Sequence, residues 1–221
     1  MKIVINGVEI SPRVSNRAAL IGMTGSGKTT LAQIFLSSFP FAVVHDAKGL
    51  IKWRGYRRHR SLSSLFADKN YDVENVNGEI REFQRLIYAP GHAEQRDTVA
   101  VNEFFRWVYE RRRTALYVDE VYRVCRRAEI PEFYHAILTQ GREYDITTLS
   151  SMQRPKLIPQ VVLSESGHFY VFRLLLEPDR EKVKETLGFP TERQQALRTH
   201  QFLYATETGA RMGPIRLRLG R

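Results

Sequence analysis

Residues 22–29 near the N-terminus have the composition of a phosphate-binding loop. They read GMTGSGKT and fit the pattern G-x-x-x-x-G-K-[ST] at every specified position. Glycines allow backbone conformations in which successive N–H groups point at a polyphosphate. Lys28 would place an ammonium on the β- and γ-phosphates, and the Thr29 hydroxyl would bind Mg²⁺. The segment predicts a site for a nucleoside triphosphate and Mg²⁺ made by Gly22, Thr24, Gly25, Ser26, Gly27, Lys28, Thr29 and Thr30.

A second chemical feature is the acidic pair Asp119 and Glu120, which follows the hydrophobic run 114–118. In an open parallel sheet, ligands bind at the carboxyl ends of the strands. We therefore expect Asp119 to hold Mg²⁺, directly or through a water, and Glu120 to orient and deprotonate an attacking water. Acidic residues at strand ends are common, but downstream of a phosphate loop the pair indicates hydrolysis.

Gln153 follows another apolar run, 146–150. If this run forms a strand next to the strand that precedes Asp119, the Gln153 amide could sense a γ-phosphate or position water. The competing interpretation is a loop glutamine that hydrogen-bonds backbone groups.

The elements that must position these residues alternate along the chain. Apolar runs at 18–21, 41–45, 85–89, 114–118, 146–150 and 168–175 are typical of buried strands, and helical spacing is found at 30–37, 98–113, 131–141, 178–187 and 191–199. This predicts an α/β protein with a RecA-like P-loop NTPase fold, a mostly parallel central sheet flanked by helices. Small β additions are expected at both termini, as a hairpin at 1–10 and strands at 201–206 and 215–219.

Length and composition predict one domain. The 221 residues would divide into an N-terminal β hairpin and loop (1–17), a core (18–206) and a C-terminal strand and tail (207–221). We expect a short helix at 61–66 and then a polar turn region up to residue 84. Cys125 is the single cysteine, so an internal disulfide is excluded, and we expect Cys125 to be a small core residue. The sequence shows neither a signal peptide nor a transmembrane run, so an intracellular, soluble protein is expected.

The charge balance points to a polyanionic partner. The chain has 34 Lys and Arg against 24 Asp and Glu, a formal net charge of +10. This favours nucleic acid or an anionic membrane surface as a partner. In the segment 52–60 cations alternate with Trp53 and Tyr56, a pattern that fits either a phosphate-backbone contact or a solvated loop.

The combination of GMTGSGKT, VVHDAKG, RLIYAP, ALYVDE, TQGREYDITTLSSMQRP and FYVFRLLLEPDREKV resembles the FtsK–HerA superfamily of ring-forming DNA-translocating ATPases. The compact length looks most like the genome-packaging ATPases of membrane-containing icosahedral viruses. The resemblance runs from about residue 18 to 206, and 142–155 is its most specific part. The winged-helix and N-terminal barrel domains of some members do not fit into this length, so readout of a specific DNA sequence is not expected.

The resemblance implies a role for each matching residue. Lys28 and Thr29 would contact nucleotide and metal, Asp119 and Glu120 would be the acidic pair, and Gln153 would be the sensor. Arg142 would be an arginine finger acting in trans on the neighbouring subunit's site, with Arg154 as the alternative finger. DNA contact would fall to loops facing a central pore, with candidate residues Lys52, Arg54, Arg57, Arg58, Arg60, Arg123, Arg126 and Arg127.

The implied function is an ATP-hydrolysing motor that translocates double-stranded DNA into a preformed viral capsid as a homo-oligomeric ring, a hexamer. Its partners would be double-stranded DNA, copies of itself, and a capsid vertex or viral membrane protein. It would act in the host cytoplasm or on the virion. Three alternatives stay open: a conjugation, phage-export or DNA-processing ATPase of the same superfamily, a nucleotide-dependent scaffold that does not hydrolyse ATP, and a small-molecule kinase. The sequence shows no Arg-rich lid that would favour the kinase.

Overall fold

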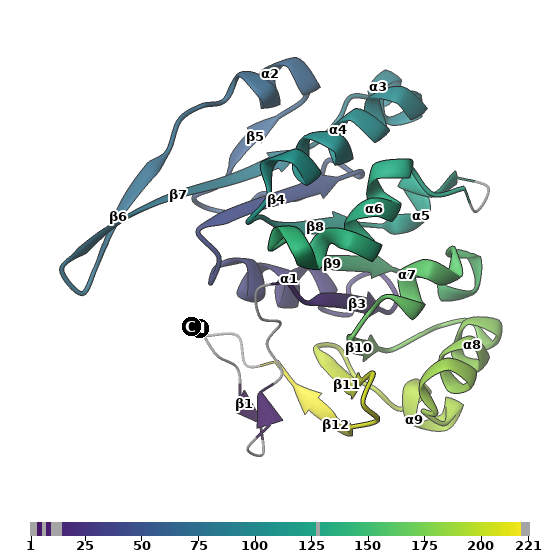
Figure 1. Ribbon diagram of the computed structural model, residues 1–221. Coiled ribbons are helices and arrows are strands. Elements are labelled where there is room, and N and C mark those ends of the chain that lie inside the picture. The colour runs from purple at the N-terminus through teal and green to yellow at the C-terminus, as the bar shows by residue number, and fades with distance from the viewer. Residues whose placement is uncertain (1–3, 6–7, 10–14, 127–128, 218–221) are drawn as a thin grey trace.

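The computed structural model describes residues 4–5, 8–9, 15–126 and 129–217. Within these residues a ten-stranded sheet has the order β12-β11-β10-β3-β9-β8-β4-β7-β5, with β6 paired to β7 (Figure 1). Its strands are β3 (Arg17–Ile21), β4 (Phe41–Asp46), β5 (Arg57–His59), β6 (Asp72–Val76), β7 (Glu79–Tyr88), β8 (Ala115–Asp119), β9 (Thr147–Met152), β10 (His168–Phe172), β11 (Gln201–Thr206) and β12 (Arg211–Arg216). The pairings from β10 to β5 are parallel, whereas β11, β12 and β6 pair antiparallel.

Helices cover both faces of the sheet (Figure 1). The helical elements are α1 (Lys28–Leu36), α2 (Leu62–Ala67), α3 (His92–Arg96), α4 (Thr98–Arg111), α5 (Val121–Val124), α6 (Glu132–Gln140), η2 (Gly141–Tyr144), η3 (Pro155–Leu157), α7 (Gln160–Ser164), α8 (Glu177–Leu187) and α9 (Thr191–Gln195). One core forms between α1 and one sheet face, and another between the opposite face and α4, α6 and α7. Because both faces are covered, the central strands are apolar throughout.

Helix α4 shows how the sequence specifies these elements. The Asp97 carboxylate accepts hydrogen bonds from the backbone N–H groups of Val99 and Ala100 and so caps the helix. Its buried side chains, which recur at helical spacing toward the sheet, are Ala100, Val101, Phe104, Phe105 and Val108. None of the helices in the described residues is long and apolar enough to span a membrane.

The structure confirms the predicted fold class, a mostly parallel sheet flanked by helices. The N-terminal addition contains β1 (Val4–Ile5) and β2 (Val8–Glu9), which pair antiparallel. The C-terminal addition is β11 and β12. Asn6 and Gly7, expected at the turn of the N-terminal hairpin, lie outside the described residues.

The prediction for residues 67–84 was wrong in one respect. Instead of a polar turn region, the chain forms β6 and the first half of β7, joined at Asn77 and Gly78, whose φ angles of 55° and 86° suit a tight hairpin turn. We call residues 72–83 the arm. It projects from the sheet edge (Figure 1). Both faces of the arm are exposed, so its sequence lacks the alternation of apolar and polar residues that identifies a strand.

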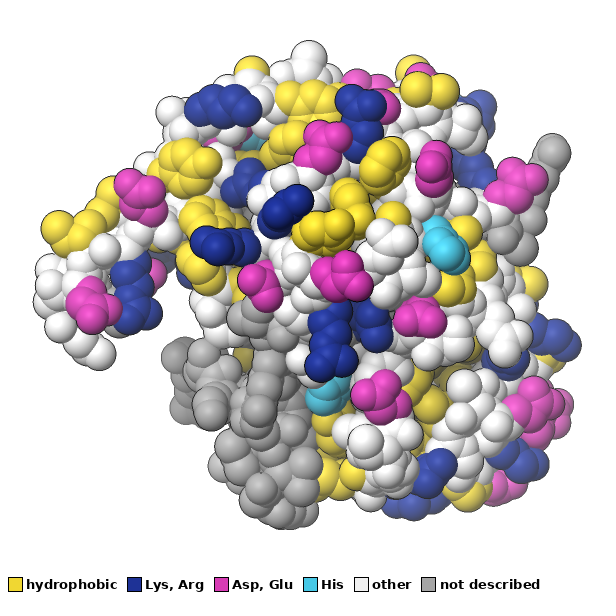
Figure 2. Space-filling view, viewed as in Figure 1, with side chains coloured by type: hydrophobic (Ala, Val, Ile, Leu, Met, Phe, Trp, Pro, Cys, Tyr) yellow, Lys and Arg dark blue, Asp and Glu magenta, His cyan; other side chains and the backbone are white. Residues whose placement is uncertain are grey.

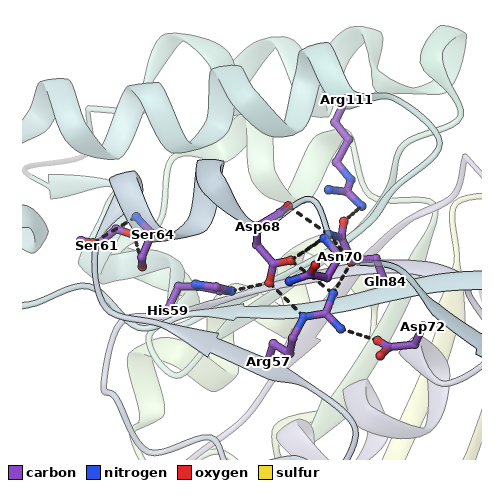
Figure 3. A network of polar contacts seen from close by, with 9 residues as sticks. All are labelled: Arg57, His59, Ser61, Ser64, Asp68, Asn70, Asp72, Gln84 and Arg111. Carbon is purple, nitrogen blue, oxygen red and sulfur yellow. Dashed lines mark hydrogen bonds and ion pairs between the residues drawn. The ribbon is translucent and has the colours of Figure 1, made fainter.

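A polar network holds the base of the arm (Figure 3). The Arg57 guanidinium donates to the Asp68 carboxylate at 2.9 Å and also contacts Asp72 and the Asn70 carbonyl. Gln84, which is fully buried, donates to the Asn70 carbonyl at 2.9 Å and accepts from Arg111. These contacts join β5, the arm and α4 at one point.

Candidate functional site

The phosphate loop lies between β3 and α1, at the carboxyl edge of the sheet. Gly27 begins the helix with φ 115°, and a Cβ there would lie 2.8 Å from Cδ2 of His200 and 3.2 Å from Cε1 of Phe172. The loop is therefore held against β10 and the start of β11, and no side chain fits at position 27. The N-terminus of α1 points its N–H groups into the loop, where an anion is favoured.

Lys28, in the phosphate loop, is buried, with 7% of its surface exposed. Its ammonium donates to the carbonyls of Gly22 at 2.7 Å and Met23 at 2.9 Å. Burial lowers the pKa of Lys28 to about 8, while the negative charges of Glu120 and Asp119 oppose this shift. The side chain is thus cationic at neutral pH and close to its titration range.

Asp119 ends β8 beside Asp46, its register partner at the end of β4. The Tyr117 hydroxyl donates to Asp119 Oδ1 at 2.9 Å, and the Lys48 ammonium lies 4.0 Å from Asp119 Oδ2. Burial raises the pKa of the Asp119 carboxyl, and the nearby Lys48 charge is the main effect that lowers it. Lys48 therefore helps to keep Asp119 ionised.

Glu120 is held by donors from two other strand ends. Its Oε2 accepts from Lys48 Nζ at 3.2 Å and from the Gln153 amide. Gln153 in turn accepts from the Thr24 hydroxyl at 2.8 Å, so the phosphate loop, Gln153, Glu120 and Lys48 form one continuous polar chain. Glu120 has a left-handed backbone, φ 68°, a strained conformation that proteins retain mainly at functional sites.

An open cavity of about 430 Å³ adjoins this chain. Its lining residues are Thr24, Gly25, Gly27, Lys28, Thr29, Thr30, Lys48, Leu50, Ile51, Lys52, Trp53, Asp119 and His200. The predicted phosphate loop and the predicted metal ligands thus meet in one space large enough for a nucleotide.

Five lining residues were not predicted as site residues: Lys48, Leu50, Ile51, Trp53 and His200. The DAKG motif placed Lys48 just after a strand end, and that position could have suggested a site residue. Trp53 stacks against Tyr117 at 6.0 Å between ring centroids. His200 has φ 61°, and its N–H donates to the Ser26 carbonyl at 2.9 Å. No local pattern reveals these contacts, because they join distant parts of the chain.

The two candidate arginine fingers have different surroundings. Arg154 follows β9 at the carboxyl edge, and its Nε donates at 2.7 Å to Asp179, a carboxylate that is 1% exposed. Arg142 precedes β9 at the opposite edge and is exposed, and its guanidinium makes no hydrogen bond or ion pair with the described residues. Six residues of β9, about 20 Å at about 3.3 Å each, separate the two edges.

The eight residues predicted to contact DNA differ in their exposure and in the contacts of their side chains. Lys52, Arg54, Arg60 and Arg123 are exposed and follow strands β4, β5 and β8, so they lie at the carboxyl edge. Arg57 belongs to the network at the base of the arm, and Arg58 donates to the carbonyls of Ile51 and Gly49. Arg126 is exposed, although its guanidinium donates to the carbonyls of Gln95 and Arg96. Arg127 lies outside the described residues.

The residues at the strand ends fit a magnesium ion that shares its ligands with a nucleotide. No cluster of three His, Cys, Asp or Glu side chains suited to a metal is found among the described residues. Mg²⁺ commonly takes one or two protein oxygens and completes its shell with phosphate oxygens and water. Thr29 and Asp119 line the cavity, and the buried Oδ1 of Asp46, beside Asp119, has no hydrogen-bond partner.

The fold and the site together define a P-loop NTPase. No family model matches the chain. The chain is 28% identical over 173 residues to the DNA packaging ATPase P9 of Enterobacteria phage PRD1, covering 78% of this chain and 70% of P9.

Solved structures show the same fold. The genome packaging NTPase B204 of Sulfolobus turreted icosahedral virus 2, in complex with AMPPCP, matches with a TM-score of 0.68 and 14% identity, over 92% of this chain and 98% of B204. The pCW3 conjugation coupling protein TcpA, with bound ATPgS, matches with a TM-score of 0.54 and 14% identity, over 87% of this chain and 58% of TcpA. The predicted resemblance to viral genome-packaging ATPases is confirmed: the chain is similar in sequence to P9 and shares its fold with B204 and TcpA.

Proposed function

We propose that this protein is an ATP-hydrolysing motor that translocates double-stranded DNA into a viral capsid, working as a homo-oligomeric ring, a hexamer. The observation that carries the proposal is the polar chain from Thr24 through Gln153 to Glu120 and Lys48, beside the cavity lined by Lys28 and Asp119. Similarity to the packaging ATPase P9 supports the packaging role. Residues 18–206 would be the core of one ATPase domain.

In this mechanism Glu120 is the general base. A water attacks the γ-phosphorus, the bond from that phosphorus to the β–γ bridging oxygen breaks, and the water proton passes to the Glu120 carboxylate. Oε2 already accepts from Lys48 and Gln153, whereas Oε1 accepts no hydrogen bond from the described residues. Oε1 is thus the oxygen that would take the proton. Lys48 holds the carboxylate in place through its contact at 3.2 Å.

Gln153 would report the state of the nucleotide. It joins Glu120 to Thr24 of the phosphate loop, so a γ-phosphate that displaces the Thr24 hydroxyl also moves a hydrogen-bond partner of the base. Lys28 would leave the Gly22 and Met23 carbonyls to contact the phosphates. Mg²⁺, bound through Thr29 and Asp119, would supply charge neutralisation on the β- and γ-phosphates.

Arg142 is the better-supported arginine finger. It lies at the sheet edge opposite the cavity and is unpaired among the described residues, so it is available to a neighbouring copy. Arg154 is held in its own subunit by Asp179. A guanidinium supplied across an interface stabilises charge on the transferring phosphoryl group and makes hydrolysis depend on the ring.

DNA contact is assigned to the exposed cations Lys52, Arg54, Arg60 and Arg123, which share the carboxyl edge with the cavity. This places the track next to the hydrolysis site. Phosphate contacts of this kind give binding that weakens as salt rises and that does not depend on base sequence.

A triplex-displacement assay tests translocation. The protein is loaded on linear duplex DNA that carries a third-strand oligonucleotide, and release of that strand is followed with ATP. We expect release with ATP and none with AMPPCP or with the Glu120→Gln variant. If ATP is consumed but the strand stays bound, the protein is an ATPase without motor activity.

A mixing experiment tests the finger in trans. Arg142→Ala protein added to wild type should lower ATPase activity by more than dilution, because each variant subunit inactivates its neighbour's site. Activity that falls only in proportion to the wild-type fraction would exclude Arg142 as a trans finger.

A further inference from the structure

The arm, residues 72–83, is a two-stranded ribbon without a covering layer. It projects from the sheet at the left of Figure 1, and Figure 2 shows hydrophobic and acidic side chains on its surface. Val73 is 64% exposed and Ile80 is 76% exposed. A two-stranded hairpin is marginally stable in water without a layer packed against it, so an exposed ribbon with apolar side chains indicates a docking element.

The register puts Val73 and Ile80 on one face of the arm, while Phe83, which pairs with Asp72, lies on the other face. Val73 pairs with Glu82, and Asn75 pairs with Ile80. Directly opposed residues in an antiparallel pair point to the same side, and residues two apart along a strand share that side. One face of the arm thus presents Val73 and Ile80 together with the carboxylate of Glu82.

The charge of the arm is opposite to that of the rest of the protein. Within residues 72–83, four acidic side chains (Asp72, Glu74, Glu79 and Glu82) stand against Arg81, a net charge of −3. With +10 for the whole chain, the remaining residues carry +13. Repulsion from phosphates excludes DNA as the ligand of the arm, and a second copy of this basic chain is electrostatically complementary to it.

The arm is held in one orientation at its base. The Arg57–Asp68 pair, the Gln84 contact with Asn70 and the Arg111 contact with Gln84 tie it to β5 and α4 (Figure 3). A docking element fixed before binding loses less conformational entropy when it binds.

The described surface contains a groove of matching chemistry between α3, the N-terminal part of α4, α5 and the residues just before α6; we call it the α3–α4–α5 groove. This cavity of about 130 Å³ has apolar walls from Val101, Val124, Ile130 and Pro131. Arg96, Arg126, Gln95, Thr98 and Glu129 complete its lining. Val99, next to the lining residue Thr98 in the first turn of α4, is 67% exposed, and the Arg126 guanidinium at the groove donates to the Gln95 and Arg96 carbonyls.

The arm and the groove lie on opposite sides of the molecule. The arm projects from the start of β7, at the same sheet edge as Arg142, whereas α3 and α5 follow the carboxyl ends of β7 and β8 (Figure 1). The arm therefore cannot reach the groove of its own chain. In a head-to-tail contact, the arm and Arg142 of one copy both face the carboxyl edge of the next copy. Contacts of this kind generate rings when the rotation closes.

We propose that the arm of one copy docks into the α3–α4–α5 groove of the next copy, with Val73 and Ile80 on the apolar walls and Glu82 facing Arg96 and Arg126. The contact orients the edge that carries Arg142 toward the neighbouring nucleotide cavity. The inference rests on the proposed homo-oligomer and gives that assembly a specific interface.

Cysteine cross-linking between two proteins tests the contact. One carries Ile80→Cys and the other Val99→Cys; Cys125 is fully buried and contributes little background. With AMPPCP and a short bis-maleimide, we expect a covalent dimer only in the mixture. The matched control replaces Val99→Cys by Leu175→Cys, a residue that is 65% exposed and lies two positions before α8, and should give at least tenfold less dimer.

Mass photometry of the same samples separates the possible failures. Oligomers that form without Ile80–Val99 cross-linking above the Leu175 control would overturn the arm contact and leave the proposed ring standing. Dimers from the Ile80→Cys protein alone would mean arm-to-arm pairing and would also overturn it. Monomers at all concentrations would refute both the arm contact and the ring.

A charge exchange gives a second readout. Glu82→Arg or Arg96→Glu alone should weaken association at least tenfold, and the double variant should recover most of it, because the pair is restored with reversed sign. Glu110→Arg, on α4 outside the groove, is the control and should leave association unchanged. Equal losses in the single and double variants would contradict a direct contact.

Discussion

His45 lies on β4 directly before Asp46, in a wholly apolar setting that makes stability depend on pH. Its ring packs against Tyr88, Phe104 and Phe105, and neither ring nitrogen has a hydrogen-bond partner. Burial lowers the pKa of His45 from 6.5 to about 4. The unfolded chain therefore binds a proton at a higher pH than the folded chain does, and the folded state loses stability as the pH falls through 6.5 toward 4.

The size of this effect follows from the two pKa values. One pKa unit corresponds to about 1.4 kcal/mol, so between pH 7.5 and pH 4.5 the protein should lose about 2.5 kcal/mol of unfolding free energy through His45 alone. Such a loss is a large part of the stability of a typical domain.

Urea unfolding at both pH values measures the loss. The His45→Leu variant, which cannot take up this proton, should lose about 2.5 kcal/mol less than wild type over the same interval. His135→Leu, which removes an exposed histidine from α6, should keep the wild-type dependence. If His45→Leu and wild type lost the same amount, His45 would not be neutral and buried in the folded protein as described.

Three further substitutions test individual contacts of the site. Lys48→Met removes the ammonium beside Glu120 and should lower kcat about 100-fold, with a smaller change in KM. A coupled ATPase assay measures both constants. An unchanged kcat would exclude a role for Lys48 in positioning the base. Arg154→Ala leaves the buried Asp179 carboxylate without its ion pair and should lower the unfolding free energy by about 2 kcal/mol. Arg142→Ala should change the unfolding free energy by less than about 0.5 kcal/mol. Equal losses for the two variants in urea unfolding would contradict the different surroundings of the two arginines. Gly27→Ala places a methyl group 2.8 Å from Cδ2 of His200 and should abolish binding of a fluorescent ATP analogue. The methyl group of Gly25→Ala would have no other atom within 4 Å, so this variant should still bind the analogue, although more weakly.

The sequence predicted the parts of the site that depend on short spacing. The phosphate loop is contiguous, and Asp119, Glu120 and Gln153 each follow an apolar run, so parallel pairing was enough to infer that they share one edge. The pairing of Lys48 with Glu120 joins residues 72 positions apart, and spacing alone cannot reveal it. His200, just before β11, contacts the phosphate loop from far along the chain and is hidden from the sequence for the same reason.

Charge patterns in the sequence were less informative than motifs. Arg57 and Arg58 look the same as Arg54 and Arg60 in a basic run, yet their guanidinium groups are taken up by Asp68 and by backbone carbonyls. The arm was missed because a ribbon exposed on both faces has no buried side to impose alternation. Tertiary contacts decide which cations remain free, and those contacts follow from the fold.

We propose that Glu120 and its polar chain make this P-loop site a DNA-dependent ATPase. Steady-state phosphate release, measured with and without linear duplex DNA for wild type and Glu120→Gln, tests it most directly. We predict turnover that DNA increases in wild type, and a loss of turnover of at least about 100-fold in the variant, which still binds a fluorescent ATP analogue. Equal phosphate release by wild type and variant, or no release by wild type under any condition, would contradict the account.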